Sequence, residues 1–320
     1  MMFSVLALAA CGVSPTQSQQ QPDTKDMLLT DHPLAGKIWD VKARKFIDRQ
    51  QLAARIGESR YLLLGETHDN QVHHQGERWA IGQLRKQQRT AAVAFEMITP
   101  QQGQVIASKQ YTTAESLIAG LNHINANWDY QKFYSAIFTE ALQAGYAVLP
   151  ANFDRQEIMA IARKGETELS PNMKTFLDNH ALPEDQVAAS HKEIEATHCG
   201  MANEKMTTAM MLVQRAKDAK MAQAMMNTSK VDTQVLVAGS GHVRNDRGVP
   251  FYLLLQGKEI NLLTIAWAEV QEEAVDAADY AAYWGAKKIP FDVVWFTPRF
   301  DRPDPCVQFR QHMKNKGSSD

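Results

Sequence analysis

The sequence predicts an α/β protein with a mainly parallel β-sheet flanked by helices. The first observation is the apolar run Tyr61–Leu64, which ends at Gly65 and is followed by polar residues that favour the start of a helix. The second is the same pattern much later in the chain, where Val235–Ala238 ends at Gly239. Short apolar runs beside a turn signal are typical of buried strands in α/β sheets. Each run leads into Gly-x-x-His, and the carboxyl ends of parallel strands are where open α/β sheets hold their ligands.

In chain order, a short helix is predicted at Asp48–Ile56, before the first strand, and a loosely helical pattern covers residues 71–88. Thr67, Asp69 and Asn70 are residue types that cap helix N-termini, so they are candidates to start that second helix. Strands alternating with helices predict parallel β-α-β units. Further strands are predicted at Ala91–Glu96, Tyr146–Asn152, Phe251–Leu255 and Ile260–Ala266, with an edge strand at Phe291–Phe296.

Two long helical stretches interrupt the predicted sheet, at residues 99–145 and 155–227. The second is broken near Pro171 and Pro183, because proline does not continue a helix. Insertions that leave the carboxyl ends of strands are well placed to cover a ligand site. The sequence therefore predicts a helical cap over the strand ends.

Composition excludes several classes of protein. The 320 residues are 44% hydrophobic and 22% charged, which is typical of a soluble globular chain. The formal net charge of −2 lacks the basic character of nucleic-acid binders, so no nucleic-acid partner is expected. There is no GxxxxGK[ST] loop, and no GxGxxG follows a strand, so nucleotide binding has no support.

The N-terminus predicts export and anchoring. Met1–Ala10 is an apolar run that resembles a secretory signal, and Leu8–Cys11 resembles a bacterial lipobox in which Cys11 becomes lipidated. No Lys or Arg precedes the run, so the true start codon can lie upstream, and an unstructured apolar N-terminus is the alternative interpretation. The absence of Asp after Cys11 points to the outer membrane. We expect a signal and lipidation cysteine at 1–11, a flexible tether at 12–33, a single domain at 34–300 and a tail at 301–320.

The other two cysteines, Cys199 and Cys306, would face an oxidising compartment after export, where disulfides persist. The sequence leaves open whether they form a disulfide or remain two separate thiols.

Ionisable residues gather at the predicted strand ends and in the cap. Imidazoles with carboxylates are ligands for zinc, iron or manganese, and they also form general acid–base pairs that need no metal. No HExxH motif is present, and a single strand-end histidine is more often a satisfied imidazole than a ligand. The repeated Gly-x-x-His setting favours function for two of them. The candidate residues are Glu66, His68, Glu96, His198 and His242.

A methionine-rich stretch with helical spacing occupies the end of the second insertion. Core filling is the default role of methionine, and an adaptable apolar wall for a large flat ligand or a dimer partner is the alternative. With the aromatic residues around Trp128, such a wall would suit a haem. Tyrosinate is one of the side chains that ligate haem iron. The methionines are Met201, Met206, Met210, Met211, Met221, Met225 and Met226.

Several of these motifs, in this order, resemble the ChaN-like haem-binding lipoproteins of the Tiki superfamily. The similarity runs from about Leu34 to Ala266. It implies an α/β body with a helical cap, surface anchoring, a role in haem or iron uptake, and haem held between two protomers. It also implies a tyrosine ligand to the iron, at Tyr134 or its neighbour Tyr130, with histidine help at the propionates. The motifs are Gly65–Asn70 with His73 and His74, Phe95–Met97, Asn127–Trp128 with Tyr134, His198–Gly200 and Gly239–Arg244.

The paired Gly-x-x-His stretches also resemble those of Tiki-type metal-dependent proteases. That resemblance would make His68, Glu96 and His242 metal ligands or catalytic groups. The sequence thus supports two hypotheses: a lipid-anchored haem-binding protein that is dimeric when loaded, and a metal-dependent hydrolase with a divalent ion.

Overall fold

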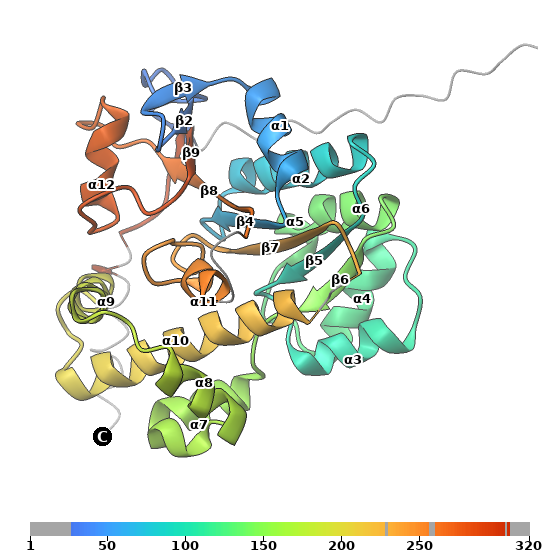
Figure 1. Cartoon of the computed structure of the whole chain (residues 1–320), viewed down its shortest axis with the longest axis vertical. Coiled ribbons are helices and arrows are strands. Elements are labelled where there is room, and N and C mark those ends of the chain that lie inside the picture. Colours follow the sequence, from blue (N-terminus) through green and yellow to red (C-terminus); the bar gives the residue numbers. More distant parts are fainter. Residues whose placement is uncertain (1–26, 228–229, 256–259, 305, 308–320) are drawn as a thin grey trace, which may run out of the picture.

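The computed structural model describes residues 27–227, 230–255, 260–304 and 306–307. An eight-stranded sheet lies at its centre, with strand order β3-β2-β9-β8-β4-β7-β5-β6 (Figure 1). The strands from β9 to β6 in this order pair in parallel, whereas β2 pairs with β3 and β9 antiparallel. The predicted α/β class with a mainly parallel sheet is confirmed. The bounds are β2 Ile38–Asp40, β3 Lys45–Ile47, β4 Tyr61–Glu66, β5 Ala91–Phe95, β6 Ala147–Pro150, β7 Thr233–Gly239, β8 Leu262–Glu269 and β9 Val293–Thr297.

Helices cover both faces of this sheet, because alternate side chains of a strand point to opposite sides. Leu62 and Leu64 of β4 join one apolar cluster, while Leu63 between them joins the other. Figure 1 shows α2, α5 and α6 on one side of β4, β7 and β5, and α10 with α11 on the other side. The first group of helices is α1 Arg49–Glu58, α2 Gln71–Lys86, α3 Pro100–Ser108, α4 Ala114–Ile124, α5 Tyr130–Phe133 and α6 Ser135–Gln143.

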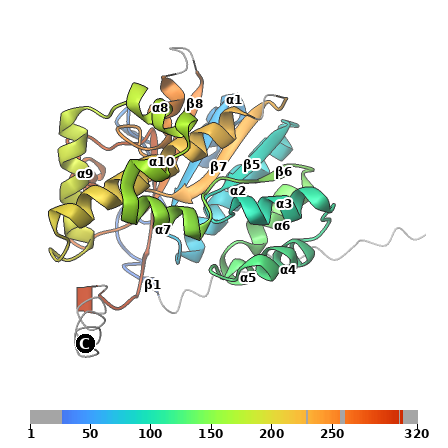
Figure 2. The same ribbon diagram turned by 90° about the horizontal axis from the view of Figure 1, so that it is seen from below.

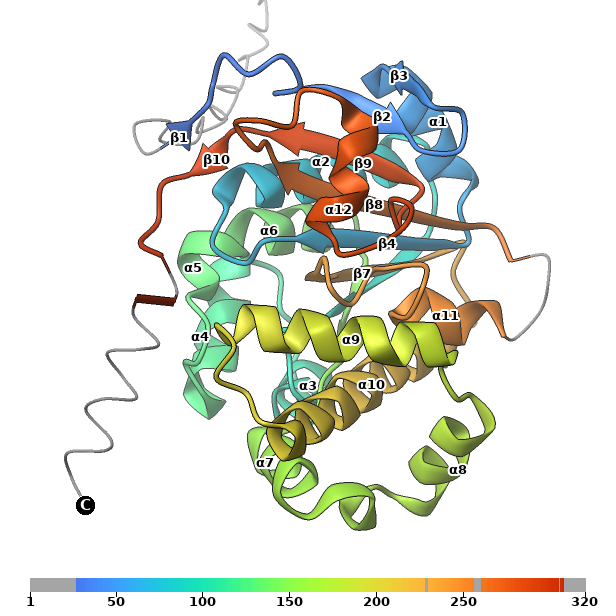
Figure 3. The same ribbon diagram turned by 90° about the vertical axis from the view of Figure 1, so that its left-hand side faces the viewer.

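The second insertion forms the opposite layer. The long helix α10 packs against β7 and lies beside α7 and α8 (Figure 2), and α9 packs against it at an angle (Figure 3). The two predicted insertions therefore cover opposite faces, and α9 with α10 supplies the part that reaches the strand ends. The bounds are α7 Arg155–Lys164, η2 Gly165–Glu168, α8 Pro171–Asn179, α9 Glu184–Thr197, α10 Glu204–Met226 and α11 Val249–Leu254, followed by η3 Ala277–Asp279 and α12 Tyr280–Tyr283.

Predicted helix starts agree with the caps in the structure. Asp48 caps α1 and forms a capping box with Gln51, as the prediction of a helix after Asp48 requires. Asn70 caps α2 by accepting a hydrogen bond from the Val72 amide. The turn between β4 and α2 is thereby fixed, and it carries the first Gly-x-x-His histidine.

Two predicted strands are wrong in type or position. The run Phe251–Leu255 belongs to helix α11, with Pro250 in its first turn. A short apolar run does not distinguish a strand from a buried helical turn. The run Phe291–Phe296 does contain a strand, β9, but β9 lies between β2 and β8 and is not an edge. The edges are β3 and β6, because the unpredicted hairpin β2–β3 extends the sheet beyond β9.

A second sheet pairs β1 (Met27–Leu28) with β10 (Arg299–Phe300). The predicted tether at 12–33 is therefore wrong for Met27 and Leu28, since Met27 is buried in the body. The lipobox residues, including Cys11, and the rest of that segment up to residue 26 lie outside the described residues.

The C-terminal segment is also attached to the body. Arg302 forms ion pairs with Asp69 at 2.8 Å and with Glu269 at 2.7 Å, and a disulfide joins Cys199 to Cys306. The start of the predicted tail at 301–320 is thus docked beside the strand ends. Within the described ranges, no helix has the length and apolar character needed to cross a membrane.

Candidate functional site

The two Gly-x-x-His stretches lie side by side because β4 and β7 are adjacent parallel strands, with Glu66 opposite Gly239. Their glycines allow this close approach. A Cβ on Gly65 would lie 3.2 Å from the Ser240 Cα, and a Cβ on Gly239 would lie 3.0 Å from His68 Nε2. Contacts below 3.4 Å force neighbouring atoms to move. The repeated pattern therefore has a packing cause, and it brings both turns to one edge of the sheet.

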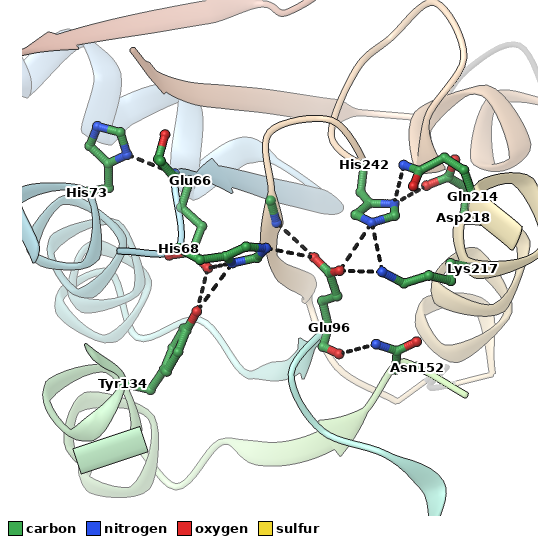
Figure 4. Close-up of polar contacts among 12 residues, drawn as sticks. Glu66, His68, His73, Glu96, Tyr134, Asn152, Gln214, Lys217, Asp218 and His242 are labelled. Carbon is green, nitrogen blue, oxygen red and sulfur yellow. Dashed lines mark hydrogen bonds and ion pairs between the residues drawn. The ribbon is translucent and has the colours of Figure 1, made fainter. Parts of the chain in front are cut away.

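His68 is oriented by Glu66, which is the last residue of β4. Its Nδ1 lies 2.8 Å from Glu66 Oε1, and the Tyr134 hydroxyl donates a hydrogen bond to the same oxygen at 2.8 Å (Figure 4). The Trp128 ring packs edge-on against the imidazole, with centroids 4.9 Å apart. Burial acts to lower the pKa of His68, but Glu66 and Glu96 outweigh it and raise the pKa. His68 is the half-buried member of this group, so it is accessible to a ligand.

His242 has a carboxylate partner of its own. Its Nδ1 lies 2.6 Å from Asp218 Oδ1, and Gln214 contacts the same nitrogen at 3.0 Å. The ring is almost fully buried, and burial alone would lower its pKa. The negative charges of Glu96 and Asp218 instead raise the pKa of His242 to about 9. The two carboxylates therefore favour the imidazolium form of His242, and the nearby Lys217 opposes it.

Glu96, which directly follows β5, lies between the two histidines (Figure 4). Its Oε1 is 3.1 Å from His242 Nε2 and 2.6 Å from the Lys217 ammonium. Its Oε2 is 3.8 Å from His68 Nε2 and accepts a hydrogen bond from the Gly239 amide. Burial acts to raise its pKa, but His242 and Lys217 hold the pKa of Glu96 well below its usual value. Two carboxylate-oriented imidazoles therefore face one shared carboxylate, an arrangement suited to moving protons.

Metal binding by the ligands predicted at the strand ends stays a prediction. Glu66, His68, Glu96 and His242 lie near one another, yet Lys217 supplies the positive charge at Glu96. In the part of the chain that the structure describes, the group with three ligand atoms within 4.8 Å of one another is Glu66, His74 and Glu77. Of these three residues, the sequence analysis singled out Glu66 as a candidate ligand.

Lys217, Asp218 and Glu77 were not predicted from the sequence, and His74 was named only as part of the ChaN-like motif. Lys217 and Asp218 lie on α10, where nothing in the sequence indicates which face meets the strand ends. His74 and Glu77 are one helical turn apart on α2, and this His-x-x-Glu spacing was the available signal. The adjacent residues His73 and His74 point to different sides of α2, since His73 contacts Thr297 while His74 contacts Glu66.

A cavity of 590 Å³ opens from these strand ends between α9 and α10. His68 and His242 lie at one end of it, and His198, which caps the end of α9, lies on its wall. The cavity thus unites all three predicted histidines. Met221 and Met225 fill the core, which is the default role, whereas Met210 and Met211 line the cavity, and their role as a wall for a large flat ligand stays a prediction.

A family model for haem-binding uptake proteins, described as Tiki superfamily, ChaN, matches residues 52–253. The chain belongs to this ChaN family. The match covers β4 to α11 and therefore both Gly-x-x-His stretches and the whole of the cap. A search of curated protein sequences finds no match.

Solved structures of other proteins resemble this fold to different degrees. A structure titled cofacial heme binding to ChaN of Campylobacter jejuni has 20% sequence identity and a TM-score of 0.58, covering 81% of this chain and 95% of that one. A mutant of the erythromycin esterase EreC, in its open conformation, has 11% identity and a TM-score of 0.45, covering 85% and 99%. The type III effector HopBA1 has 14% identity and a TM-score of 0.40, covering 77% and 91%. At these identities the likeness concerns the fold.

The two tyrosines that the ChaN resemblance suggested as iron ligands are fully buried. The Tyr130 hydroxyl donates to the Met97 carbonyl at 2.6 Å, and the Tyr134 hydroxyl donates to Glu66. Burial raises the pKa of Tyr130 to about 12, and burial together with Glu66 raises the pKa of Tyr134 further still. Neither tyrosine lines the cap cavity. Ligation of iron by either one stays a prediction.

Proposed function

We propose that this ChaN-family chain binds haem in the cavity between α9 and α10 and takes part in bacterial haem or iron uptake. The family match over residues 52–253 supports haem as the ligand class. The cavity itself is the observation that supports this location for the haem. Ligand sites of this size are mostly apolar with a few polar groups, and the cavity lining has this composition. Met210, Met211 and Ile194 supply apolar wall, and Lys217 and Arg215 supply positive charge.

The donor set of the cavity fits haem as cargo. The His198 Nδ1 lies 2.8 Å from the Ile194 carbonyl, which suits a ring that donates through this nitrogen. Metal-binding histidines commonly donate one ring nitrogen to a carbonyl in this way. We assign His198 as the iron donor on the cavity wall, with Arg215 as a partner for a haem carboxylate.

Haem titration of the soluble body tests this proposal. The chain from residue 12 onward is titrated with haem while the Soret band is followed, and His198→Ala, Tyr134→Phe and Tyr130→Phe are titrated in parallel. We expect saturable binding that His198→Ala weakens and Tyr130→Phe leaves intact. Binding weakened by Tyr134→Phe alone would return the ligand to the tyrosine that the family resemblance suggested. Absence of a Soret shift in the native protein would refute the proposal.

We further propose that Cys11 is lipidated, that the protein is held at the outer membrane, and that it dimerises when haem is bound. The lipobox-like Leu8–Cys11 supports the anchor. Detergent partitioning and mass spectrometry of the mature chain test it, with Cys11→Ser expected to release the protein to the aqueous phase. Sedimentation with and without haem tests the dimer, and a monomer at saturating haem would exclude it.

The second function that we propose is hydrolysis at the strand ends, as in the metal-dependent Tiki-type interpretation of the sequence. The favouring observation is the pair of His–carboxylate dyads that face Glu96. His68 is the accessible base, since Glu66 orients it and one face of the ring meets the cavity. The Lys217 ammonium lies against Glu96 and neutralises its charge, as a metal ion would do in a metal-dependent site.

Hydrolysis of chromogenic ester and peptide substrates tests this second function. We expect His68→Ala to abolish turnover. Lys217→Met should impair turnover if the chemistry needs no metal, and should leave turnover unchanged if the chemistry depends on a metal. Activity that is equal in native protein and His68→Ala would eliminate the strand-end site as its source.

A further inference from the structure

A second cluster of ligating side chains lies behind Glu66, on the side of the sheet covered by α2. His74 Nδ1 is 2.6 Å from Glu66 Oε2 and 3.1 Å from Glu77 Oε2. All three side chains are at most 4% exposed. Their ligand atoms lie within 4.8 Å of one another, which is the spacing of groups that share one ion.

The imidazole of His74 is oriented as a ligand would be. Its Nε2 lies 3.1 Å from the His68 carbonyl, so Nε2–H donates and Nδ1 faces the two carboxylates. Metal-binding histidines almost always donate their second ring nitrogen to a carbonyl or carboxylate in this way. On Glu66, Oε1 is held by Tyr134 and His68, which leaves Oε2 directed at the cluster.

Two buried oxygen atoms of the cluster lack a hydrogen bond of good geometry. In the described residues, Glu77 Oε1 accepts no hydrogen bond, and Glu66 Oε2 makes no hydrogen bond of good geometry although it faces His74. The ion pairs of these two carboxylates in the described ranges are all with His68 or His74, not with Lys or Arg. Buried polar atoms of this kind are costly and call for an explanation, such as an ion.

We propose that Glu66, His74 and Glu77 bind a divalent transition-metal ion. One imidazole nitrogen with two carboxylates suits Zn²⁺, and also Mn²⁺ or Fe²⁺, better than Mg²⁺ or Ca²⁺, which favour all-oxygen sites. Tyr134 and the His68 carbonyl act as the outer supports of the ligands. Ligation requires His74 Nδ1 and both carboxylates to be free of protons, so the affinity for the ion should fall at low pH.

This site is separate from the haem proposal and from the metal set that the sequence suggested at the strand ends. It shares Glu66 with the strand-end group, but His74 and Glu77 do not line the cap cavity. The ion would lie on the far side of Glu66 from His68 and would fix the carboxylate that orients this histidine. Lys217 remains the partner of Glu96 in either state.

Metal binding by the full chain, freed of metal with a chelator, is the direct test. Zn²⁺ alone is titrated by calorimetry, and Co²⁺ is added as a spectroscopic probe whose visible bands report nitrogen and oxygen ligands. We expect one equivalent of Zn²⁺, a rise in Tm on binding, and at least tenfold weaker binding in Glu77→Gln and in His74→Gln. Glu96→Gln, which removes the strand-end carboxylate, and Glu140→Gln, a buried carboxylate elsewhere on this face, should bind as the native protein does.

Circular dichroism confirms that each variant is folded. X-ray absorption of the native Co²⁺ complex adds a readout that needs no variant, because this site supplies one imidazole whereas the strand-end group would supply two. No stoichiometric binding would overturn the proposal. Binding that Glu96→Gln removes and Glu77→Gln retains would also overturn it, by placing the ion at the strand ends.

Discussion

Asp218 Oδ1 lies 2.6 Å from His242 Nδ1, across the gap between α10 and the end of β7. This contact fixes which ring nitrogen faces the strand ends, since Nε2 then points to Glu96. The same relationship recurs at Glu66 and His68 on the neighbouring strand. The cap therefore does more than cover the edge of the sheet: it completes one of the two dyads.

Replacing Asp218 with Asn should lower the pKa of His242. The Asp218 charge and hydrogen bond both favour the imidazolium, and loss of a close opposite charge shifts a pKa by about 1–3 units. Titration of the His242 ring by NMR measures the change. Asp178→Asn, an exposed carboxylate on α8, is the control and should leave the ring unaffected. An unchanged titration in Asp218→Asn would show that Glu96 alone sets the protonation of His242.

Stability of the metal-free protein should fall as the pH rises above neutrality. The folded-state pKa of His242 is about 9, against about 6.5 in an unfolded chain, so its contribution is complete below about pH 6.5 and is lost as the pH passes about 9. His74 acts in the same direction: burial lowers its pKa, but Glu66 and Glu77 raise it to about 10. Thermal unfolding from pH 6 to 10 measures this loss.

The matched variants for the pH series are His242→Gln and His123→Gln. His123 is exposed on α4, so its loss should leave the pH dependence as it is in the native protein. His242→Gln should flatten the decline between pH 6.5 and 9. A decline of equal steepness in His242→Gln and native protein would assign it to other groups.

Gly239→Ala should disturb His68, whereas Gly241→Ala should not. The added methyl on Gly239 would lie 3.0 Å from His68 Nε2, but on Gly241 it would meet nothing within 4 Å. Displacing His68 from Glu66 should lower the pKa of His68 and cost about 1–3 kcal/mol of stability, the usual effect of overpacking. NMR titration and thermal unfolding of both variants provide the comparison. Equal behaviour of the two would mean that the loop accommodates the methyl group.

The fold class and the strand-end residues were predictable from the sequence because their signals are local. Apolar runs that end in Gly-x-x-His place Glu66, His68 and His242 at strand ends wherever the helices pack, provided that the strands are parallel. The helix starts at Asp48 and Asn70 are equally local. The local sequence pattern was thus sufficient to predict which residues lie at the carboxyl end of each strand.

Other features depend on tertiary packing, which a single sequence does not contain. Lys217 and Asp218 join the site because the face of α10 that carries them packs towards the end of β7. Apolar and polar residues are spread almost evenly around α10, so the sequence does not indicate which face is buried. The hairpin β2–β3 was missed since its strands have three residues each. The run at Phe251 became a helix because Gly248 and Pro250 start one there, and its leucines favour a helix although its two aromatic residues do not.

Arg302→Gln should destabilise the fold although it lies in the predicted tail. Arg302 pairs with Glu269, whose side chain is 5% exposed, and its removal would leave that carboxylate buried with the Asn70 amide as a remaining donor. Loss of a hydrogen bond to a charged group costs about 1.5–3 kcal/mol. Denaturant unfolding measures the cost, with the exposed Arg163→Gln on α7 expected to change stability by less than about 0.5 kcal/mol. If both substitutions cost the same, the ion pair contributes nothing.

The disulfide between Cys199 and Cys306 should stabilise the cap. It closes a loop of 107 residues between the α9–α10 turn and the C-terminal segment, which restricts the unfolded chain. Native disulfides commonly contribute about 2–4 kcal/mol. We therefore expect Cys306→Ser and Cys199→Ser to lower the Tm equally, and the double variant to lose no more than either one. A reducing agent should lower the Tm of the native protein to that of the variants and leave the variants unchanged.

Because His198 precedes Cys199, haem affinity measured on the same samples would reveal whether the bond also holds the cavity wall in place. A native Tm that is insensitive to reduction would show that the two segments stay docked without the bond.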